Sequence, residues 1–162
     1  MTDLATIAPA FVDMAHRIVW CTVATVGPDE QPRTRILHPY WTWDGTTLTG
    51  VIATSPTPLK RAHLDHSPYL SLTYWQPNHD TCTADCSAEW ILDDAGREEL
   101  WRTLAEAPEP VGYDPAIIPP WKDGPLSPAF AGLRLRPHRL RVMPGEVMLQ
   151  GKPELLMTWS ES

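Results

Sequence analysis

Apolar and polar residues alternate along much of this chain, and turn residues interrupt the alternation at regular intervals. Runs rich in Val, Thr, Ile and Trp that end at Gly, Pro or Asp are typical of short strands in an all-β domain. The pattern predicts strands over residues 19–26, 33–41, 48–53, 69–75, 81–92 and 133–143, and a closing hairpin from 147–149 and 155–159. We expect about six or seven antiparallel strands in a β-barrel with helical additions.

Helical spacing of apolar residues appears in three places. The first helix is expected over 7–17, with Pro9 in its first turn. The second is expected over 54–66, where the prolines at 56 and 58 fit only the first turn. The third starts at Asp93 and Asp94, which are good N-caps. The proline-rich segment 107–128 carries aromatic and aliphatic residues, and an ordered loop of this length is often functional.

Four arginines mark the last long strand. Arg134 and Arg136 have one parity along the strand, whereas Arg139 and Arg141 have the other. A one-residue slip at Pro137 would place all four on one face, so the pattern predicts a β-bulge there.

Composition and charge narrow the class of protein. The 162 residues are 43% hydrophobic and 20% charged, which favours a single globular domain over residues 1–162. No signal peptide and no apolar run of about 20 residues is visible, so we expect a soluble, cytoplasmic protein without a membrane partner. The net charge of −7 argues against nucleic-acid binding. Three cysteines, an odd number, argue against a disulfide framework.

The stretch 32–60 combines groups that a bound phosphate requires. Arg33 and Arg35 lie two residues apart on a predicted strand and therefore share one face. A hairpin later, a helix start offers hydroxyls and a cation. Because Pro56 and Pro58 remove two backbone donors there, side chains must supply most contacts. The predicted phosphate site comprises Arg33, Arg35, Thr54, Ser55, Thr57 and Lys60.

Two other kinds of site are weaker alternatives. A metal site could combine His79, Cys82 and Cys86. The two cysteines lie on one face of a strand but about 13 Å apart, so they cannot chelate one metal ion together without a break in the strand. A nucleophile with a base could pair Cys21 or Ser55 with one of the histidines 38, 63 and 66, but no nucleophile motif frames these residues.

The order of elements and several motifs resemble a known family. The residues that carry the resemblance are Thr22–Val26, Pro32–Leu37, Thr54–Lys60, Ser67–Leu72, Tyr74–Trp75 and Arg134–Val142. Together they are similar to the flavin-binding split barrel of the pyridoxamine 5'-phosphate oxidase-like group, over roughly residues 11–142. The Trp- and Pro-rich composition looks most like actinobacterial members, some of which use a deazaflavin instead of FMN.

The resemblance implies a homodimer with two cofactor sites at the subunit interface. Arg35, Thr54, Ser55 and Lys60 would contact the cofactor phosphate. Ile36, Leu37 and His38 would line the ring through their backbone, and Trp121 or Trp159 of the other subunit could approach it. The substrate-reading residues of the oxidase itself are not matched near the C-terminus, so the resemblance does not imply that substrate.

We therefore expect a flavin- or deazaflavin-dependent oxidoreductase that acts on a small molecule, with FMN as the first choice of cofactor and a deazaflavin as the alternative. No catalytic proton donor can be assigned from the sequence. The alternative function is a non-catalytic protein that binds or sequesters a flavin or, less readily, haem.

Overall fold

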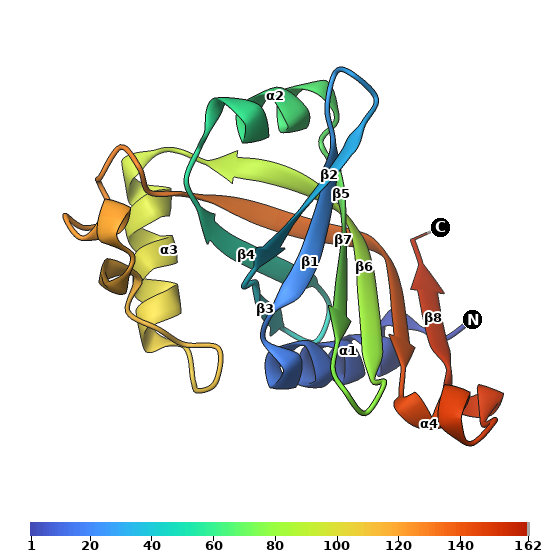
Figure 1. Cartoon of the computed structure of the whole chain (residues 1–162). Coiled ribbons are helices and arrows are strands. Elements are labelled where there is room, and N and C mark those ends of the chain that lie inside the picture. Colours follow the sequence, from blue (N-terminus) through green and yellow to red (C-terminus); the bar gives the residue numbers. More distant parts are fainter. Residues whose placement is uncertain (162) are drawn as a thin grey trace.

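Eight strands and four α-helices make up the fold in the computed structural model, which describes residues 1–161 (Figure 1). In chain order the elements are α1 (Leu4–Ile18), β1 (Cys21–Val26), β2 (Pro32–Leu37), β3 (Tyr40–Trp43), β4 (Leu48–Thr54), α2 (Pro58–His66), β5 (Tyr69–Trp75), β6 (Thr81–Ile91), α3 (Asp94–Glu106), β7 (Ala131–Met143), α4 (Gly145–Leu149) and β8 (Met157–Ser160). Short 3-10 turns lie at Pro115–Ile117, Pro119–Trp121 and Pro153–Leu155.

The strand order explains why the barrel is split. All pairs are antiparallel, the order is β2-β1-β5-β6-β7-β4-β3, and β8 adds to β7. The two ends of this order, β2 and β3, are separated in sequence only by His38 and Pro39. The sheet must therefore curl until its two edges are close, although β2 and β3 do not pair. This confirms the predicted antiparallel split barrel, with one strand more than expected.

The predicted single strand over 33–41 is in fact two strands. It breaks at His38-Pro39, where Pro39 is buried and has no N–H for a ladder bond. The chain leaves β1 at this point and joins β4 as strand β3, with Trp41 opposite Gly50. The break thus creates the split and brings His38 to its edge.

The bulge on β7 is confirmed within one residue. The β6–β7 register shifts so that Asp85 faces Arg139 whereas Cys86 faces Pro137, which leaves His138 as the extra residue. All four arginines of β7 are exposed as a result, and the alternate residues Leu133, Leu135, Leu140 and Val142 are buried.

The core lies inside the barrel and is closed at one end by α1 (Figure 1). This helix begins three residues earlier than predicted because Asp3 caps it by accepting a hydrogen bond from Thr6 N, and Pro9 therefore lies inside the helix. Phe11 is fully buried and packs edge-on against Trp41 and Tyr74. A smaller second core, with Leu104 and Phe130, joins α3 to the outside of β4.

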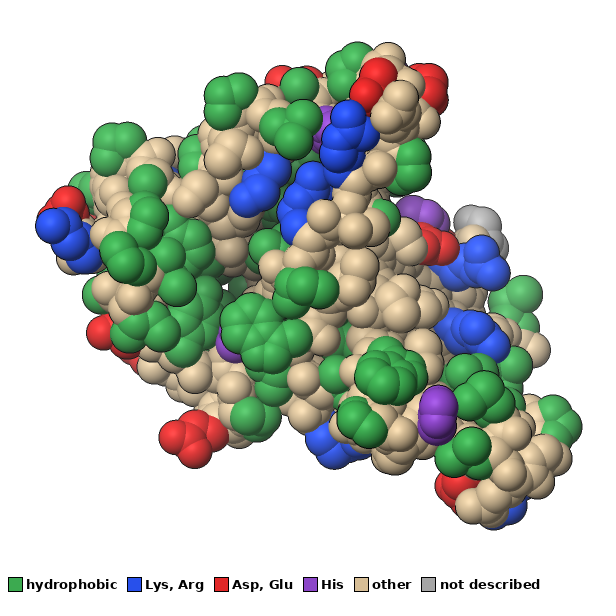
Figure 2. All heavy atoms as spheres, viewed as in Figure 1, with side chains coloured by type: hydrophobic (Ala, Val, Ile, Leu, Met, Phe, Trp, Pro, Cys, Tyr) green, Lys and Arg blue, Asp and Glu red, His purple; other side chains and the backbone are tan. Residues whose placement is uncertain are grey.

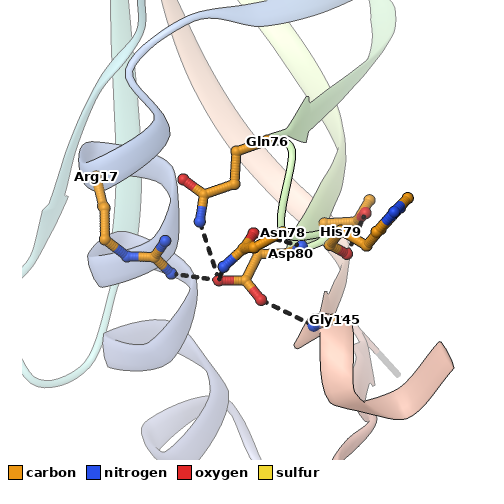
Figure 3. A network of polar contacts seen from close by, with 7 residues as sticks. Arg17, Gln76, Asn78, His79, Asp80 and Gly145 are labelled. Atoms are coloured by element: carbon orange, nitrogen blue, oxygen red, sulfur yellow. Dashed lines mark hydrogen bonds and ion pairs between the residues drawn. The ribbon is translucent and has the colours of Figure 1, made fainter. Parts of the chain in front are cut away.

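The predicted closing hairpin is wrong in its first half. Residues Gly145–Leu149 form α4 instead of a strand, and β8 pairs with β7. The start of α4 is fixed by Asp80, whose carboxylate accepts a hydrogen bond from Gly145 N at 2.8 Å and another from Arg17 at 2.9 Å (Figure 3). Gln76 and Asn78 also donate to Asp80.

Asp80 therefore ties three segments together: the end of α1, the β5–β6 turn and the start of α4 (Figure 3). In the part of the chain that the structure describes, no helix is long and apolar enough to span a membrane.

Candidate functional site

A narrow cationic corner lies at the split of the barrel. Arg35 of β2, Thr54 at the end of β4 and Lys60 in the first turn of α2 line a cavity of about 10 Å³. The β2 and β4 ends are not paired with each other, so this space is open to side chains from both. Its apolar wall is formed by Val23, Leu37, Leu64, Leu70 and Leu133.

Two positive charges meet in this corner without a compensating carboxylate. Within residues 1–161, neither Arg35 nor Lys60 forms an ion pair. Burial and then the nearby Arg35 charge lower the pKa of Lys60, and burial lowers that of Arg35. In a chain of net charge −7, two partly buried cations with no carboxylate partner among residues 1–161 are suited to an anionic ligand.

Thr54 is oriented to add a donor to the corner. Its Oγ1 accepts a hydrogen bond from Lys60 Nζ at 2.6 Å, and the side chain is almost fully buried. A hydroxyl that accepts through its oxygen keeps its own hydrogen available. Thr54 can therefore fix the ammonium group of Lys60 and still donate to a bound anion.

A larger apolar chamber opens beside the corner. Its volume of about 340 Å³ lies within the range of small-molecule pockets. Leu37 lines both cavities, so the chamber and the corner adjoin. Figure 2 shows basic side chains gathered between β2 and α2, next to a hydrophobic surface over the 107–128 loop. The chamber is lined by Val19, Trp20, Ile36, Leu37, His38, Ala53, Pro110, Gly112, Tyr113, Ile117, Ile118 and Trp121.

His38 is the unusual residue of the chamber wall. Its ring stacks on Tyr113 with centroids 5.0 Å apart and lies 5.1 Å from the Trp20 ring. Its Nε2 is buried and has no hydrogen-bond partner among the described residues. Burial lowers the pKa of His38, and a backbone hydrogen bond with Val111 opposes this effect. A neutral imidazole with an unpaired nitrogen is suited to a ligand group that hydrogen-bonds to it.

Trp121 connects the proline-rich loop to the phosphate segment. Its Nε1 donates to Ser55 Oγ at 3.1 Å and to the Ala129 carbonyl at 2.9 Å. The indole is buried against Phe130 and lines the chamber of its own chain. The family resemblance implies that Trp121 or Trp159 of a second subunit approaches the site. Trp159 lies elsewhere, on β8, and packs against the main core.

The structure brings together most of the predicted site residues, but Arg33, Ser55 and Thr57 line neither cavity. Arg33 forms an ion pair with Asp29 at 3.1 Å and lines neither cavity. Thr57 is exposed and caps α2 by accepting a hydrogen bond from Lys60 N. Arg33 was predicted to join the site because it lies two residues from Arg35 on the same strand. Thr57 was predicted to join it because it lies at the start of the helix that carries Lys60. The structure shows that each already has a local partner.

Several site residues escaped the sequence prediction. Thr25 lines the corner and hydrogen-bonds to Arg35 and His63, although the sequence around it in β1 gave no sign of a polar role. Tyr113 and Ile117 line the chamber from the loop. The one available signal for them was the apolar character of a long proline-rich segment.

A nucleophile with a histidine base does not form. The Cys21 thiol is buried, which raises its pKa to about 12, and its Sγ donates to the Leu37 carbonyl. Ser55 Oγ is engaged by Trp121, not by a histidine. His63 hydrogen-bonds to Thr25, and His66 lies 3.0 Å from Glu30.

The corner and chamber fit a planar cofactor with a terminal phosphate. The unpaired cations Arg35 and Lys60 match the charged end. The chamber offers an apolar wall for a ring and one unpaired nitrogen on His38. These three features concern different properties of the site: the charge of the corner, the volume of the chamber and the hydrogen-bonding capacity of His38.

Comparison with known proteins places the chain in a family. The sequence profile described as "Pyridoxamine 5'-phosphate oxidase" matches residues 7–144. No curated protein matches the chain. Among solved structures, a Clostridium acetobutylicum protein of the pyridoxinephosphate oxidase family has a TM-score of 0.68 at 15% identity, covering 97% of this chain and 94% of its own.

Two further structures differ in the cofactor that their descriptions name. An FMN-binding, pyridoxamine 5'-phosphate oxidase-related protein from Nostoc punctiforme has a TM-score of 0.60 at 16% identity, covering 99% of this chain and 100% of its own. An F420 reductase has a TM-score of 0.54 at 13% identity, covering 80% of this chain and 94% of its own. At such identities these structures show the common fold. From the profile match over most of its length, the chain belongs to the pyridoxamine 5'-phosphate oxidase-like family of FMN-binding split barrels.

Proposed function

We propose that this protein is an FMN-dependent oxidoreductase for a small molecule. The observation that carries the proposal is the pair of unpaired cations, Arg35 and Lys60, at the end of an apolar chamber that Leu37 joins to them. A flavin mononucleotide has the same division, with an anionic end and a flat, mostly apolar ring system. The family assignment supports this cofactor, and the two cavities indicate which residues of this chain would hold it.

The form of the corner favours a terminal phosphate. A phosphate monoester carries close to two negative charges at neutral pH, which two cations match. The corner is narrow and its wall includes Val23, Leu64 and Leu70, which favours a group that ends there over one that continues. A deazaflavin such as F420 carries its phosphate as a diester with one charge and a further tail. We therefore place FMN ahead of a deazaflavin.

Each residue has a stated task in this proposal. Arg35 and Lys60 neutralise the phosphate, and the side chains shift outward to admit it because the corner itself holds about 10 Å³. The Thr54 hydroxyl donates to it. Trp20, Tyr113 and Trp121 exclude water from the ring. The bound flavin would supply the redox chemistry, namely transfer of two electrons to or from a small molecule.

A second copy of the chain is part of the proposal. The β1–β2 and β1–β5 registers place Ile36 and Thr73 beside Thr22 on the outer face of the sheet. Tyr69 and Trp75 share this face, and their side chains are 60% and 55% exposed. Exposed aromatic residues on a sheet face next to the chamber are suited to a homodimer interface that closes the chamber.

A non-catalytic flavin- or haem-binding role is the second candidate. The observation in its favour is the shortage of proton donors. Among the described residues, the titratable side chains that line the chamber are His38 and Tyr113, and burial raises the pKa of Tyr113 to about 12. A binding protein needs no proton donor, although hydride transfer does not always require one either.

The proposal is tested by titrating the purified protein with FMN, riboflavin, F420 and haem. Absorbance and flavin fluorescence follow the binding. Two charge-assisted hydrogen bonds contribute about 3 kcal/mol or more, so FMN should bind at least about 100-fold more tightly than riboflavin, which lacks the phosphate. Tighter binding of F420 or haem, or equal affinity for FMN and riboflavin, would overturn the choice of FMN.

Turnover separates the enzyme from the binding protein. The reduced FMN complex is mixed anaerobically with a panel of small electron acceptors, and reoxidation is followed at the flavin absorbance band. Reoxidation that is faster than with free reduced FMN identifies an enzyme. Rates equal to those of free FMN across the panel favour the non-catalytic role.

A further inference from the structure

Arg35 and Thr25, which both line the cationic corner, begin a hydrogen-bonded chain that ends at His63, outside the cavity lining. Arg35 Nη1 donates to Thr25 Oγ1 at 2.8 Å, and Thr25 Oγ1 lies 2.9 Å from His63 Nδ1. Thr25 is 5% exposed and His63 is 1% exposed, so both are shielded from solvent. The chain joins three elements: β2, β1 and α2.

The strand register explains why Thr25 reaches Arg35. In the β1–β2 ladder Val23 faces Arg35 and Thr25 faces Arg33, so Thr25 and Arg35 are diagonal neighbours on one face. Diagonal pairs in antiparallel strands lie within reach of a long side chain. Arg33, which directly faces Thr25, pairs instead with Asp29.

The lack of a side chain at Gly27 leaves space for the His63 ring. Gly27 stands at the end of β1, and a Cβ at this position would lie 2.7 Å from His63 Nε2. The absence of a side chain at Gly27 therefore leaves the room that the imidazole occupies. His63 belongs to α2, the helix that also presents Lys60 to the corner.

The hydrogen-bond pattern fixes the role of Thr25 toward Arg35. Thr25 Oγ1 accepts from Arg35, which is always protonated, so its single hydrogen is free to point to His63 Nδ1. In the arrangement that we expect, Thr25 donates this hydrogen to Nδ1, and the His63 proton lies on Nε2. The 2.9 Å contact is also compatible with the opposite direction, in which Nδ1–H donates to the second lone pair of Thr25 Oγ1. In either case protein groups form both bonds of the series from the guanidinium through the hydroxyl to the imidazole.

We propose that Thr25 and His63 are positioning residues for the phosphate-binding guanidinium of Arg35. This inference rests on the proposed function and adds how the corner is held ready. Arg35 has no carboxylate to orient it within the described chain, and a free arginine side chain samples many rotamers. Anchoring one nitrogen to Thr25 leaves most of the five N–H donors for the ligand.

The pair also couples Arg35 to Lys60. Thr54 holds Lys60 from the β4 side, whereas Thr25 and His63 hold Arg35 from the β1 and α2 sides. Because His63 and Lys60 share α2, a shift of this helix would change the positions of both cations together. The two cations are thereby coupled before a phosphate enters, and they would move together when the corner widens to admit it.

The first test compares Thr25→Val with Thr25→Ser. Valine has the shape of threonine but no hydroxyl, and serine keeps the hydroxyl. Dissociation constants for FMN and for riboflavin are measured by flavin fluorescence. We expect Thr25→Val to bind FMN about tenfold more weakly, with riboflavin affinity unchanged within about twofold. Thr25→Ser should bind both flavins nearly as the unmodified protein does.

The ratio of the two affinities separates positioning from a general structural role. A Thr25→Val protein that binds FMN as tightly as the unmodified chain overturns the inference while the proposed function stands. Equal weakening for FMN and riboflavin also overturns it, since riboflavin does not reach the corner. If the unmodified chain itself fails to prefer FMN to riboflavin, the proposed function fails, and this outcome is distinct from the other two.

A second measurement does not depend on any flavin. Nitrogen-15 NMR of the histidine rings reports which nitrogen of His63 carries the proton. We expect protonation on Nε2 and an unprotonated, hydrogen-bonded Nδ1, with the Nδ1 signal shifting in Thr25→Val. A proton on Nδ1 overturns the stated direction of the chain. His63→Asn, which keeps an acceptor near the Nδ1 position, and His63→Leu give a second pair if Thr25→Val does not fold.

Discussion

Trp121 Nε1 donates a hydrogen bond to Ser55 Oγ over 3.1 Å, and this contact joins the proline-rich loop to the segment that follows β4. The two residues are 66 positions apart in the sequence. The same nitrogen also donates to the Ala129 carbonyl. The wall of the chamber and the edge of the cationic corner are therefore built as one unit.

Replacing Trp121 by phenylalanine tests this unit. Trp121→Phe keeps an aromatic ring but loses the N–H, so we expect the free energy of unfolding to fall by about 1–3 kcal/mol. Both FMN and riboflavin should bind more weakly by a similar factor, because the chamber holds the ring that the two flavins share. Urea denaturation and flavin titration measure the two effects.

The matched control is Trp101→Phe. Trp101 packs against Phe130 from another side and does not line the chamber. The Trp101→Phe variant should lose little flavin affinity. Weakening of FMN but not of riboflavin in Trp121→Phe would show that Trp121 acts on the phosphate and not on the ring.

Replacing His38 by phenylalanine should weaken FMN binding without lowering the stability of the fold. Its buried Nε2 lacks a partner among residues 1–161, so His38→Phe removes an unsatisfied polar atom and should leave the free energy of unfolding unchanged or raise it by about 1–2 kcal/mol. FMN binding should weaken nevertheless, because the ligand loses its hydrogen-bond partner. A variant that is less stable and binds FMN normally would contradict the role given to this nitrogen.

The pH dependence of His38 has a definite sign. Burial lowers its pKa in the folded state, so the unfolded chain binds the proton more readily. The stability of the unmodified protein should therefore decrease relative to His38→Phe as pH falls below about 6.5, the ordinary histidine value. Urea denaturation at several pH values between 5 and 8 measures the difference, which should be constant above pH 7.

Asp80 should matter for stability and not for the cofactor. Burial alone would raise its pKa, but hydrogen bonds from Gly145, Asn78 and Arg17 hold the pKa below the ordinary value. Asp80→Asn should lower the free energy of unfolding by about 1–3 kcal/mol near neutral pH. The difference should shrink as pH falls below about 3.9, where the carboxylate becomes protonated in the unfolded chain.

Flavin affinity at neutral pH is the control for Asp80→Asn. The Asp80 cluster lies at the α1–α4 end of the molecule and lines neither the corner nor the chamber (Figure 3). FMN should therefore bind to the folded variant as it does to the unmodified protein. A stability difference that persists unchanged to pH 3 would show that the charge of Asp80 is not its source.

The proposed dimer can be disrupted at Ile36. This side chain is 62% exposed on the outer face of β2 and also lines the chamber. Ile36→Asp would place a charge in the proposed interface, so analytical ultracentrifugation should show a dimer for the unmodified protein and a monomer for the variant. Leu126→Asp, at an exposed position on the loop, should remain dimeric. A monomeric unmodified protein would exclude this interface.

Local patterns in the sequence were sufficient for most of the fold. The bulge near Pro137 could be predicted because four arginines and their apolar neighbours change parity there. The break at His38-Pro39 could not, since a strand that continues and a strand that changes partner look alike in sequence. Only the global pairing of β3 with β4 decides between them. Helix α4 was missed because five residues give too little periodicity.

The candidate site was predictable where charge carried the signal. Arg35 was found as one of two arginines on a strand face and Lys60 as the cation at a helix start, and the structure brings them to one cavity. Arg33 has the same parity as Arg35, and only the position of Asp29 in the turn separates the two. Thr25 and His63 were beyond prediction as a pair, because their contact depends on how α2 packs on β1.

The most direct test of the account compares the affinity for FMN with that for riboflavin in Arg35→Ala/Lys60→Ala and in the control Arg33→Ala. Arg33 lies two residues from Arg35 but is paired with Asp29 and lines neither cavity. The double variant should lose at least about 100-fold in FMN affinity, keep its riboflavin affinity and remain folded, while Arg33→Ala binds both as the unmodified chain does. Unchanged FMN affinity in the folded double variant would contradict the assignment of the phosphate site.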